Sequence, residues 1–509
     1  MVRELRRKLP GIVPSLQAEQ KRKHEYNDEF RIILCPSRTP TGWKISPERL
    51  AEVLSFQSFW IYGSKYWRVY GDGRETGSRH SCFISLSLVN NELALHNGSY
   101  QSPKCIYPVG LFYEGDSRDN LEENLGFPNS WLNKFIEKES TKGDHFFLCG
   151  DEMFLEAMLD GKNELSPTSN DGWNIYTKCT KDQKSLTDPT TKRRTDLHPR
   201  FDREYPTSIL RSIPLENTVF CLLYGLARCV EKLLTLVVQY ILLHSNIVNE
   251  QGLDGTAYRK EKLHTLETNI NKRGVRQGKF IIPFDAGGKL QQIKLNKDHA
   301  WVIISPAPAG KEEEFPHVLS DVLPDINHKI TIPFNVCMEL KIKDQYSETE
   351  LVSAIWAHFY NMVAMLKKDP PPKPKRENQG PSKNVNDFSW GFTSEEVDGY
   401  KAHAEIFYQL FSFRYTAREL TPYMIKLVDY GSHFMKNLPV PICRFQAEGG
   451  EHTNYEHSTY YYNHTTRHGG NFTLDPMLAI FRNMWRRTCY QISTNTDTAE
   501  GRAAAAAFA

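Results

Sequence analysis

The chain has 509 residues, of which 40% are hydrophobic and 24% are charged, a composition that is ordinary for a globular protein. This length is too great for one simple core and predicts two to four domains. The formal net charge is only +2, which excludes a polycationic protein, so any surface that binds nucleic acid must be a local basic patch.

The first part of the chain predicts an α/β core. Residues 1–60 mix basic runs with proline and are predicted to be an arm or the remnant of an upstream region. Residues 67–97 predict a strand, a glycine-containing turn and two further strands. Residues 145–159 predict a short apolar strand that runs into a helix, so residues 61–160 should form the first part of the core.

The middle of the chain, residues 161–400, is predicted to be a mostly helical insertion. Its most apolar segment, residues 218–244, is interrupted by Arg228, Glu231 and Lys232. A membrane span is therefore not expected. The helical spacing of the apolar residues predicts a long amphipathic core helix instead.

The insertion contains a second predicted helix at residues 348–367 and a Pro-rich, charged linker at residues 368–387. In residues 294–306, Asp298 and His299 precede an apolar run that predicts a strand. A capping role for these two side chains is favoured over a catalytic pair.

Helical patterning fills residues 401–490, and residues 491–509 form a low-complexity tail. The basic N-terminus is not followed by an apolar stretch of signal-peptide length. The ten cysteines show no C-x-x-C spacing, so neither a thiolate zinc site nor a redox motif is expected. A reducing, intracellular compartment is the default expectation for such a chain.

Three acidic residues stand out by their local setting. Asp72 lies in "VYGDGRETG", at the end of an apolar strand, where a turn would expose its carboxylate. Asp151 follows an apolar strand in "FFLCGDEMF", and Glu451 lies at the entry to a helix in "FQAEGGEHTNY". Such carboxylates could converge on Mg²⁺, which prefers oxygen ligands, and two such ions could promote phosphodiester cleavage. The alternative is three ordinary solvated acids among the 61 in the chain, since GDG is commonly a turn.

The order and flanks of these acids resemble the catalytic core of the V(D)J recombinase large subunit and of its relatives, the Transib transposases. "YGDGRETGSRHSCFISLSLVNN" and "FFLCGDEMF" are similar to the settings of the two aspartates of that family. Residues 413–435, followed by "AEGGEHTN", are similar to the segment that leads to its glutamate. The resemblance implies an α/β fold, with a ribonuclease-H-like mixed sheet that is interrupted by a large helical insertion.

Carried over to this chain, the resemblance implies a DDE triad made of Asp72, Asp151 and Glu451, with Glu448 as the alternative glutamate. These residues would bind two Mg²⁺ or Mn²⁺ ions and catalyse DNA cleavage or strand transfer. In the family, the helix that carries the glutamate lies along DNA.

That placement implies DNA contacts for Asn454, Arg467 and His452. The resemblance implies DNA as the partner and the nucleus as the compartment, with no membrane partner. It leaves room for a homodimer and for a separate targeting protein.

The chain departs from the family at the positions of a structural zinc site. Relatives carry a C-x-x-C soon after the second aspartate and two histidines in a later helix. Here residues 161–173 contain no cysteine, and Ile425 and Tyr430 stand where the histidines would fall. The joint loss of all four ligands predicts that no structural zinc is bound. A further departure is that Asp72 lies too near the start for the family's upstream DNA-end-binding region, which predicts a fragment, a domesticated remnant or a partner-dependent protein.

Four histidines in the same C-terminal segment could suggest a second metal site: His452, His457, His464 and His468. The last two are four residues apart, which suits a helical metal pair. No third ligand recurs at a convincing spacing, so a polar helix face with aromatic side chains beneath it is the favoured interpretation.

Three classes of function stay open. The first is a DDE-type nuclease or strand transferase, and the second is an inactive transposase-derived scaffold that binds DNA or protein. The third is an unrelated interaction protein whose acids match by chance, which requires the three carboxylates to lie far apart.

Overall fold

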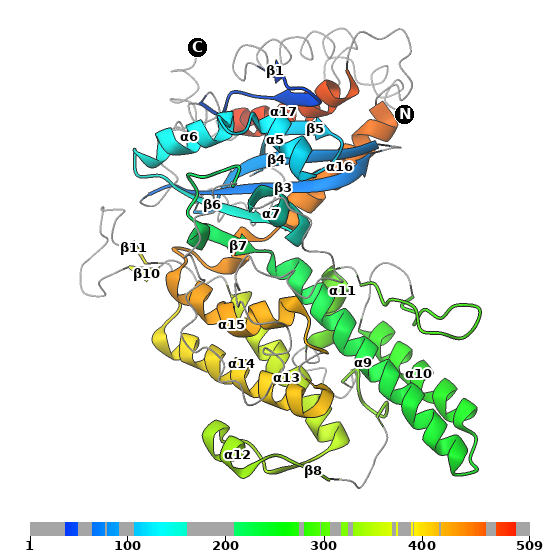
Figure 1. Cartoon of the computed structure of the whole chain (residues 1–509). Helices are drawn as coiled ribbons and strands as arrows, with labels where there is room; N and C mark the ends of the chain where they lie inside the picture. Colours follow the sequence, from blue (N-terminus) through cyan, green and yellow to red (C-terminus); the bar gives the residue numbers. More distant parts are fainter. Residues whose placement is uncertain are drawn as a thin grey trace, which may run out of the picture.

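The computed structural model of the chain describes an α/β unit and a group of helices (Figure 1). No helix along the described part is both long and apolar enough to cross a membrane. The residues that the structure describes are 36–48, 64–76, 79–90, 106–159, 208–273, 279–295, 297–305, 317–323, 329–368, 373–374, 388–389, 391–416, 419–464 and 475–494.

A seven-stranded mixed sheet forms the centre of the described α/β part, with the strand order β1-β2-β5-β4-β3-β6-β7. Neighbours from β1 to β3 in this order are antiparallel, whereas β6 is parallel to β3 and β7 is parallel to β6. The strands are β1 (Ser37–Arg38), β2 (Gly42–Lys44), β3 (Tyr66–Thr76), β4 (Arg79–Leu88), β5 (Tyr107–Tyr113), β6 (His145–Gly150) and β7 (Thr218–Phe220).

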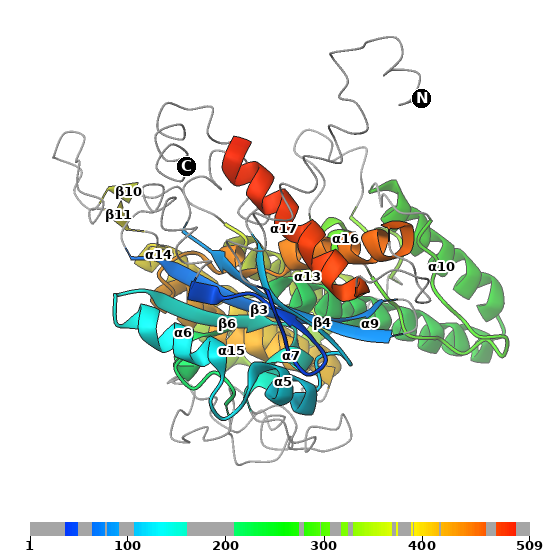
Figure 2. The ribbon, with the colours of Figure 1, turned by 90° about the horizontal axis from the view of Figure 1, so that it is seen from above.

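Helices cover both faces of this sheet (Figure 2). One face packs against α5 (Arg118–Leu125), α6 (Trp131–Ser140) and α7 (Glu152–Leu159), and the other packs against α16 (Glu448–His464) and α17 (Pro476–Thr494). Successive side chains of a strand point to opposite faces. Accordingly, the ring of Trp67 on β3 contacts Phe135 of α6, whereas the ring of Tyr70 lies against Gly450 of α16.

The remaining helices gather beyond the β7 edge of the sheet, where α9 and α10 project as a hairpin (Figure 1). Two of these helices, α13 and α14, begin with complete capping boxes, Ser347 with Glu350 and Thr393 with Glu396, which satisfy backbone N–H groups at the helix start. The helices are α9 (Leu222–Glu250), α10 (Gly255–Lys272), α11 (Lys297–Ile304), α12 (Phe334–Leu340), α13 (Glu348–Leu366), α14 (Ser394–Tyr415) and α15 (Pro422–Asn437).

Short elements complete the described part: the 3₁₀ helices η3 (Leu215–Asn217) and η6 (Ile442–Phe445), and the strands β8 (Lys329–Thr331), β9 (Gln345–Ser347), β10 (Lys373–Pro374) and β11 (Phe388–Ser389). Strand β8 pairs with β9, and β10 pairs with β11. These two small sheets are separate from the central sheet.

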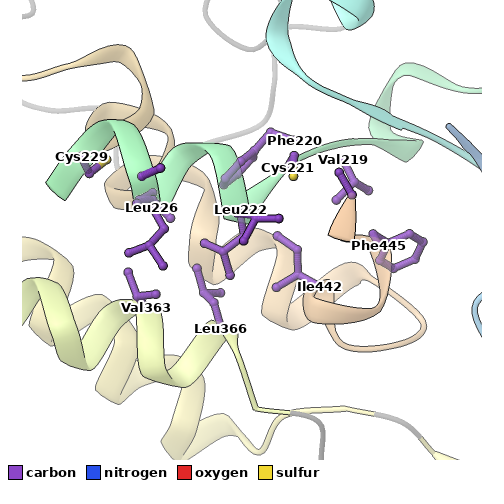
Figure 3. Close-up of a cluster of buried hydrophobic side chains, with 14 of the residues drawn as sticks. Val219, Phe220, Cys221, Leu222, Leu226, Cys229, Val363, Leu366, Ile442 and Phe445 are labelled. Carbon is purple, nitrogen blue, oxygen red and sulfur yellow. The ribbon is translucent and has the colours of Figure 1, made fainter. Parts of the chain in front are cut away.

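A buried apolar cluster joins the helices to the sheet beside β7 (Figure 3). Val219 of β7 and Leu222 of α9 lie in it with Val363 of α13 and Ile442 of η6, and all four side chains are buried. The segment that leads into α16 is therefore packed against the same core as the start of α9.

The start of the long apolar helix differs from its prediction. Residues 218–220 form β7, because they pair in parallel with β6, and α9 begins only at Leu222. The apolar residues of β7 are buried like those of the helix, so helical spacing alone could not separate the two elements. The predicted helix at residues 348–367 is confirmed as α13.

The strand predicted within residues 294–306 is wrong, because Lys297–Ile304 form helix α11. Its buried residues Ala300 and Ile304 are four positions apart, and the helix packs against α9. Asp298 and His299 therefore lie in the first turn of a helix rather than before a strand.

Part of the predicted N-terminal arm belongs to the sheet, because residues 42–44 form β2 and pair with β5. The third strand of the predicted meander is β5, which begins at Tyr107 rather than before residue 97. Residues 1–35, 91–105 and the tail from residue 495 lie outside the described residues, as do most of residues 368–387.

Candidate functional site

Two of the predicted aspartates lie side by side at one edge of the sheet. Strands β3 and β6 are parallel, and Gly71 of β3 stands opposite Gly150 of β6. Asp72 follows Gly71, and Asp151 follows Gly150, so the two aspartates come directly after this pair of residues. Functional residues of α/β sheets commonly lie at the carboxyl ends of parallel strands, because neighbouring strands deliver side chains to the same edge there.

The backbone at Asp72 is not the exposed turn that the sequence predicts. Strand β3 continues to Thr76 and pairs Asp72 with Phe83 of β4, so the Asp72 side chain is only 7% exposed. The flanking glycines serve close packing instead. A Cβ at Gly71 would lie 2.1 Å from the Phe154 ring of α7, so this position in the strand admits no side chain.

The sequence prediction for Asp151 is confirmed in its setting, because an apolar strand precedes it and a helix follows. The half-buried side chain accepts a hydrogen bond at Oδ1 from the backbone N–H of Phe154, at 2.8 Å. Asp151 thus caps the N-terminus of α7, where the helix dipole favours a negative charge. The bond fixes the carboxylate beside the end of β6.

Helix α16 packs onto β3 at two points. The Nδ2 group of Asn454 donates a hydrogen bond to Oδ2 of Asp72 at 2.6 Å. Four residues earlier, a Cβ at Gly450 would lie 2.1 Å from Cε1 of Tyr70, which shows how closely the two backbones approach. Position 451 lies between these contacts, so α16 brings Glu451 to the Asp72 end of β3. The side chains of Glu451 and of the alternative Glu448 lie outside the described part.

Sequence reasoning missed a third carboxylate, Asp116. A Cβ at Gly73 would lie 2.4 Å from Oδ1 of Asp116, so this side chain packs on the β3 face opposite to Asp72. Burial raises the pKa of the Cys82 thiol well above its ordinary value, and the charges of Asp116, Asp72 and Asp151 raise it further. All three carboxylates therefore lie within electrostatic range of one buried sulfur atom.

A signal for Asp116 was present in the sequence. The segment "LFYEGDS" places Gly-Asp soon after an apolar strand, much as "FFLCGDE" does for Asp151. The strand in question is β5, two places from β3 in the sheet, so its end lies near the end of β3.

The three predicted DNA contacts have different positions. Asn454 is buried and bonded to Asp72, so the structure gives it a positioning role, and a DNA contact there stays a prediction. His452 is exposed, and its Nε2 lies 3.1 Å from Oε1 of Glu456 one turn later. Arg467 lies outside the described residues.

His457 belongs to the core of the site rather than to a metal cluster. Its ring is buried, meets Phe83 edge-to-face, and contacts the sulfur of Met484 through Nε2. Burial and, to a smaller extent, the charge of Arg74 lower the pKa of His457 to about 3, so the ring is neutral at pH 7. Because a thioether has no hydrogen to donate, the contact fits a ring that carries its proton on Nε2.

The positions aligned with the family's zinc-binding histidines pack as apolar core. Tyr430 of α15 is buried, and Ile425 is partly buried against the same cluster. Residues 161–173 and His468 lie outside the described part, and so does the side chain of His464. Within the described residues, no three His, Cys, Asp or Glu side chains form a group that could hold a metal ion.

The donor chemistry at the sheet edge nevertheless suits a hard divalent cation. Asp72 and Asp151 supply carboxylate oxygens, the ligand type that Mg²⁺ and Mn²⁺ prefer. One partner of Asp72 is the neutral amide of Asn454, which orients the carboxylate. The predicted third oxygen ligand is Glu451, with Glu448 as the alternative, and both residues lie in α16.

No protein-family model matches the chain, and a search of curated proteins found no match. Function must therefore be inferred from the residues and their geometry.

Proposed function

We propose that this chain cleaves DNA phosphodiester bonds with the help of divalent metal ions and transfers the resulting strand ends, as a DDE transposase does. The observation that carries the proposal is the joint placement of Asp72, Asp151 and α16. The two aspartates follow equivalent positions of parallel strands, and Asn454 of α16 is bonded to Asp72. The two aspartates of the sheet and the helix that carries Glu451, which are far apart in sequence, thus support a shared site.

A ribonuclease-H-like core is part of the same proposal. Its support is the order β5-β4-β3-β6-β7, in which an antiparallel meander is followed by two parallel strands. In a ribonuclease-H-like sheet the first strand of the antiparallel meander is the central strand, and β3 is the corresponding strand of this chain. The helices α9 to α15 would then be the large insertion between the second aspartate and the glutamate.

The residues of the chain have separable tasks in this mechanism. Asp72 and Asp151 would hold the cations from the sheet, and Glu451 would complete the ligand set from α16. Asn454 orients Asp72, and the helix cap orients Asp151, so each carboxylate is held by a hydrogen bond before a cation binds. A bound pair of Mg²⁺ or Mn²⁺ ions would activate a water or a DNA 3′-hydroxyl and stabilise the departing oxygen. Asp116 adds a negative charge that favours cations at this edge.

Plasmid nicking tests the proposal. The purified chain is incubated with supercoiled DNA and Mg²⁺ or Mn²⁺, and the conversion to the open-circular form is measured. We expect nicking that requires the metal and that falls by at least about 100-fold in Asp72→Asn, Asp151→Asn and Glu451→Gln, since each change removes one charged ligand. Circular dichroism should show that all three variants stay folded.

The matched control is Asp398→Asn on α14, an exposed aspartate that pairs with Lys401. It loses the same charge away from the sheet edge and should nick DNA like the wild type. Nicking that survives Glu451→Gln would exclude the triad. A wild-type chain that binds DNA but never nicks it would favour the alternative function, an inactive transposase-derived scaffold.

A further inference from the structure

A groove lies on the projecting hairpin, away from the sheet edge. It has a volume of about 660 Å³ and runs between the last turns of α9, one face of α10 and Phe284. Its size falls in the range of ligand-binding clefts. The α10 residues that line it are spaced by one to four positions and form one helix face: Thr256, Arg259, Lys260, Leu263, His264 and Glu267.

Three of these six α10 residues are of basic types, Arg259, Lys260 and His264, and one is acidic, Glu267. Among the ion pairs of the described residues, none involves these three basic side chains. Several other basic residues of the helical region form ion pairs, for example Lys232 with Glu419. Two adjacent cationic side chains, Arg259 and Lys260, that line a cleft favour an anionic ligand.

Two acidic groups nearby accept hydrogen bonds from backbone N–H groups, and Glu261 lies 3.7 Å from Lys262. Oε1 of Glu267 accepts a hydrogen bond from the N–H of Ile282 at 2.8 Å, which ties the segment with Phe284 to α10. Oδ1 of Asp254 caps the N-terminus of α10. The guanidinium carbon of Arg259 lies 4.9 Å from the centre of the Phe284 ring. This cation–π contact orients the guanidinium, whose N–H groups are the donors for an anionic ligand.

We propose that this groove binds the phosphate backbone of DNA that flanks the cleavage site. Arg259 and His264 are five residues apart, which is about 8 Å along a helix. A DNA strand carries one charge per roughly 3.4 Å of axis, so the row can meet more than one phosphate. A single small anion would instead need donors that converge on one point.

The position of the groove sets the length of DNA that it requires. Helix α9 runs without a break from β7, beside the catalytic edge, to the groove (Figure 1). Its 29 residues span about 44 Å, the length of about 13 base pairs. The inference rests on the proposed function for the identity of the ligand, since DNA is the substrate there.

DNA binding by fluorescence anisotropy tests the inference. The full chain is titrated against a labelled 40-base-pair duplex in EDTA at several salt concentrations, so cleavage does not contribute. The double variant Arg259→Gln with Lys260→Gln should bind at least about tenfold more weakly. The slope of log affinity against log salt should become shallower by about 2, because roughly 0.9 is lost for each phosphate contact.

The control variant is Lys343→Gln with Lys401→Gln, which removes the same charge from exposed, ion-paired lysines outside the groove. This control variant should change the affinity by less than about twofold. Shortening the duplex should weaken binding by the wild type, but should change the affinity of the Arg259→Gln, Lys260→Gln variant by less than about twofold. Arg259→Lys keeps the charge and should retain most of the binding. An unchanged affinity and salt slope in the double variant would overturn the inference, and so would displacement of DNA from the wild type by millimolar inorganic phosphate alone.

Failure of this inference can be told apart from failure of the proposed function. DNA that binds through the groove but is never nicked would leave the inference standing and remove the catalytic proposal. Nicking that requires Asp72 but does not change when Arg259 and Lys260 are replaced would support the catalytic proposal and overturn the inference about the groove.

Discussion

The hydrogen bond between Asn454 and Asp72 is the contact on which the candidate site depends. Burying a carboxylate is costly unless hydrogen bonds replace its water. An amide meets this need without neutralising the charge, whereas a lysine would compete with a metal ion for the same oxygen atoms. The bond also joins α16 to β3 across 382 positions of sequence.

Replacing Asn454 should therefore change metal use more than it changes stability. We expect Asn454→Ala to lower metal affinity or nicking by about 10- to 100-fold, the usual effect of losing an outer-shell partner of a ligand. The measurement is the metal concentration that gives half-maximal nicking.

Thr453→Ala is the matched control for Asn454→Ala. Thr453 is equally buried on α16, but its hydroxyl bonds to the carbonyl of Gly449 within the helix. Both variants should lose about 1 kcal/mol of stability, the typical value of one hydrogen bond. An equal loss of metal response in the two variants would show that Asn454 acts only through the packing of α16.

The single residues of the site were only partly accessible from the sequence. The setting of Asp151 was predictable, because a run of apolar residues before Gly-Asp is a local pattern. The burial of Asp72 was not, because it depends on β4 and on Phe154, which approaches Gly71 from α7. Asp116 was missed because its pattern gains meaning only once the order of the strands is known.

At the scale of elements, the approach of α16 to β3 depends on a glycine that the helix would otherwise disfavour. Glycine in a helix costs roughly 1 kcal/mol relative to alanine. At position 450 a methyl group would collide with the Tyr70 ring, which is itself buried under α16. Because position 450 is glycine, α16 lies close enough to β3 for Asn454 to bond with Asp72.

Gly450→Ala should reverse the normal effect of a helical Gly-to-Ala change. Overpacking costs about 1–3 kcal/mol, which outweighs the gain in helix propensity. We expect a lower unfolding midpoint in urea together with weaker nicking, because α16 must move outward.

Gly399→Ala on α14 provides the comparison for Gly450→Ala. There the nearest atom is the flexible end of Met365, at 3.2 Å, so the change should be neutral or stabilising. Equal stabilities of the two alanine variants would contradict the close packing of α16 on β3.

Elements were predictable where local pattern and burial agree. The helix at residues 348–367 was predicted and is confirmed as α13, whose capping box is a local sequence pattern. β7 and α11 were misread because an apolar run has the same composition in a strand and in a helix. Only the pairing of β7 with β6, and the packing of α11 on α9, decide between them.

At the scale of the whole molecule, one buried histidine and two half-buried ones in separate regions respond to acid in the same direction. Burial lowers the pKa of His457 to about 3 and of His317 to about 4. Burial and the charge of its neighbour His403 on α14 lower the pKa of His358 to about 4. The two Nδ1 atoms lie 2.9 Å apart. Each ring is therefore neutral in the folded chain at pH 7, while an unfolded histidine takes up a proton near pH 6.5.

Stability should accordingly be highest above about pH 6.5 and should fall as the pH drops from there toward the folded pKa values near 4 and 3, because the unfolded chain then binds more protons. For the fully buried His457, the loss between pH 7.5 and pH 5 is about 2 kcal/mol. Urea unfolding across this pH range measures the loss of stability.

His457→Leu should flatten the curve of stability against pH by that amount, since leucine suits the apolar contacts with Phe83 and Met484 and cannot take up a proton. The exposed His452→Gln on the same helix is the control, and its curve should parallel that of the wild type. A His457→Leu curve that is as steep as the wild-type curve would assign the acid sensitivity to other groups.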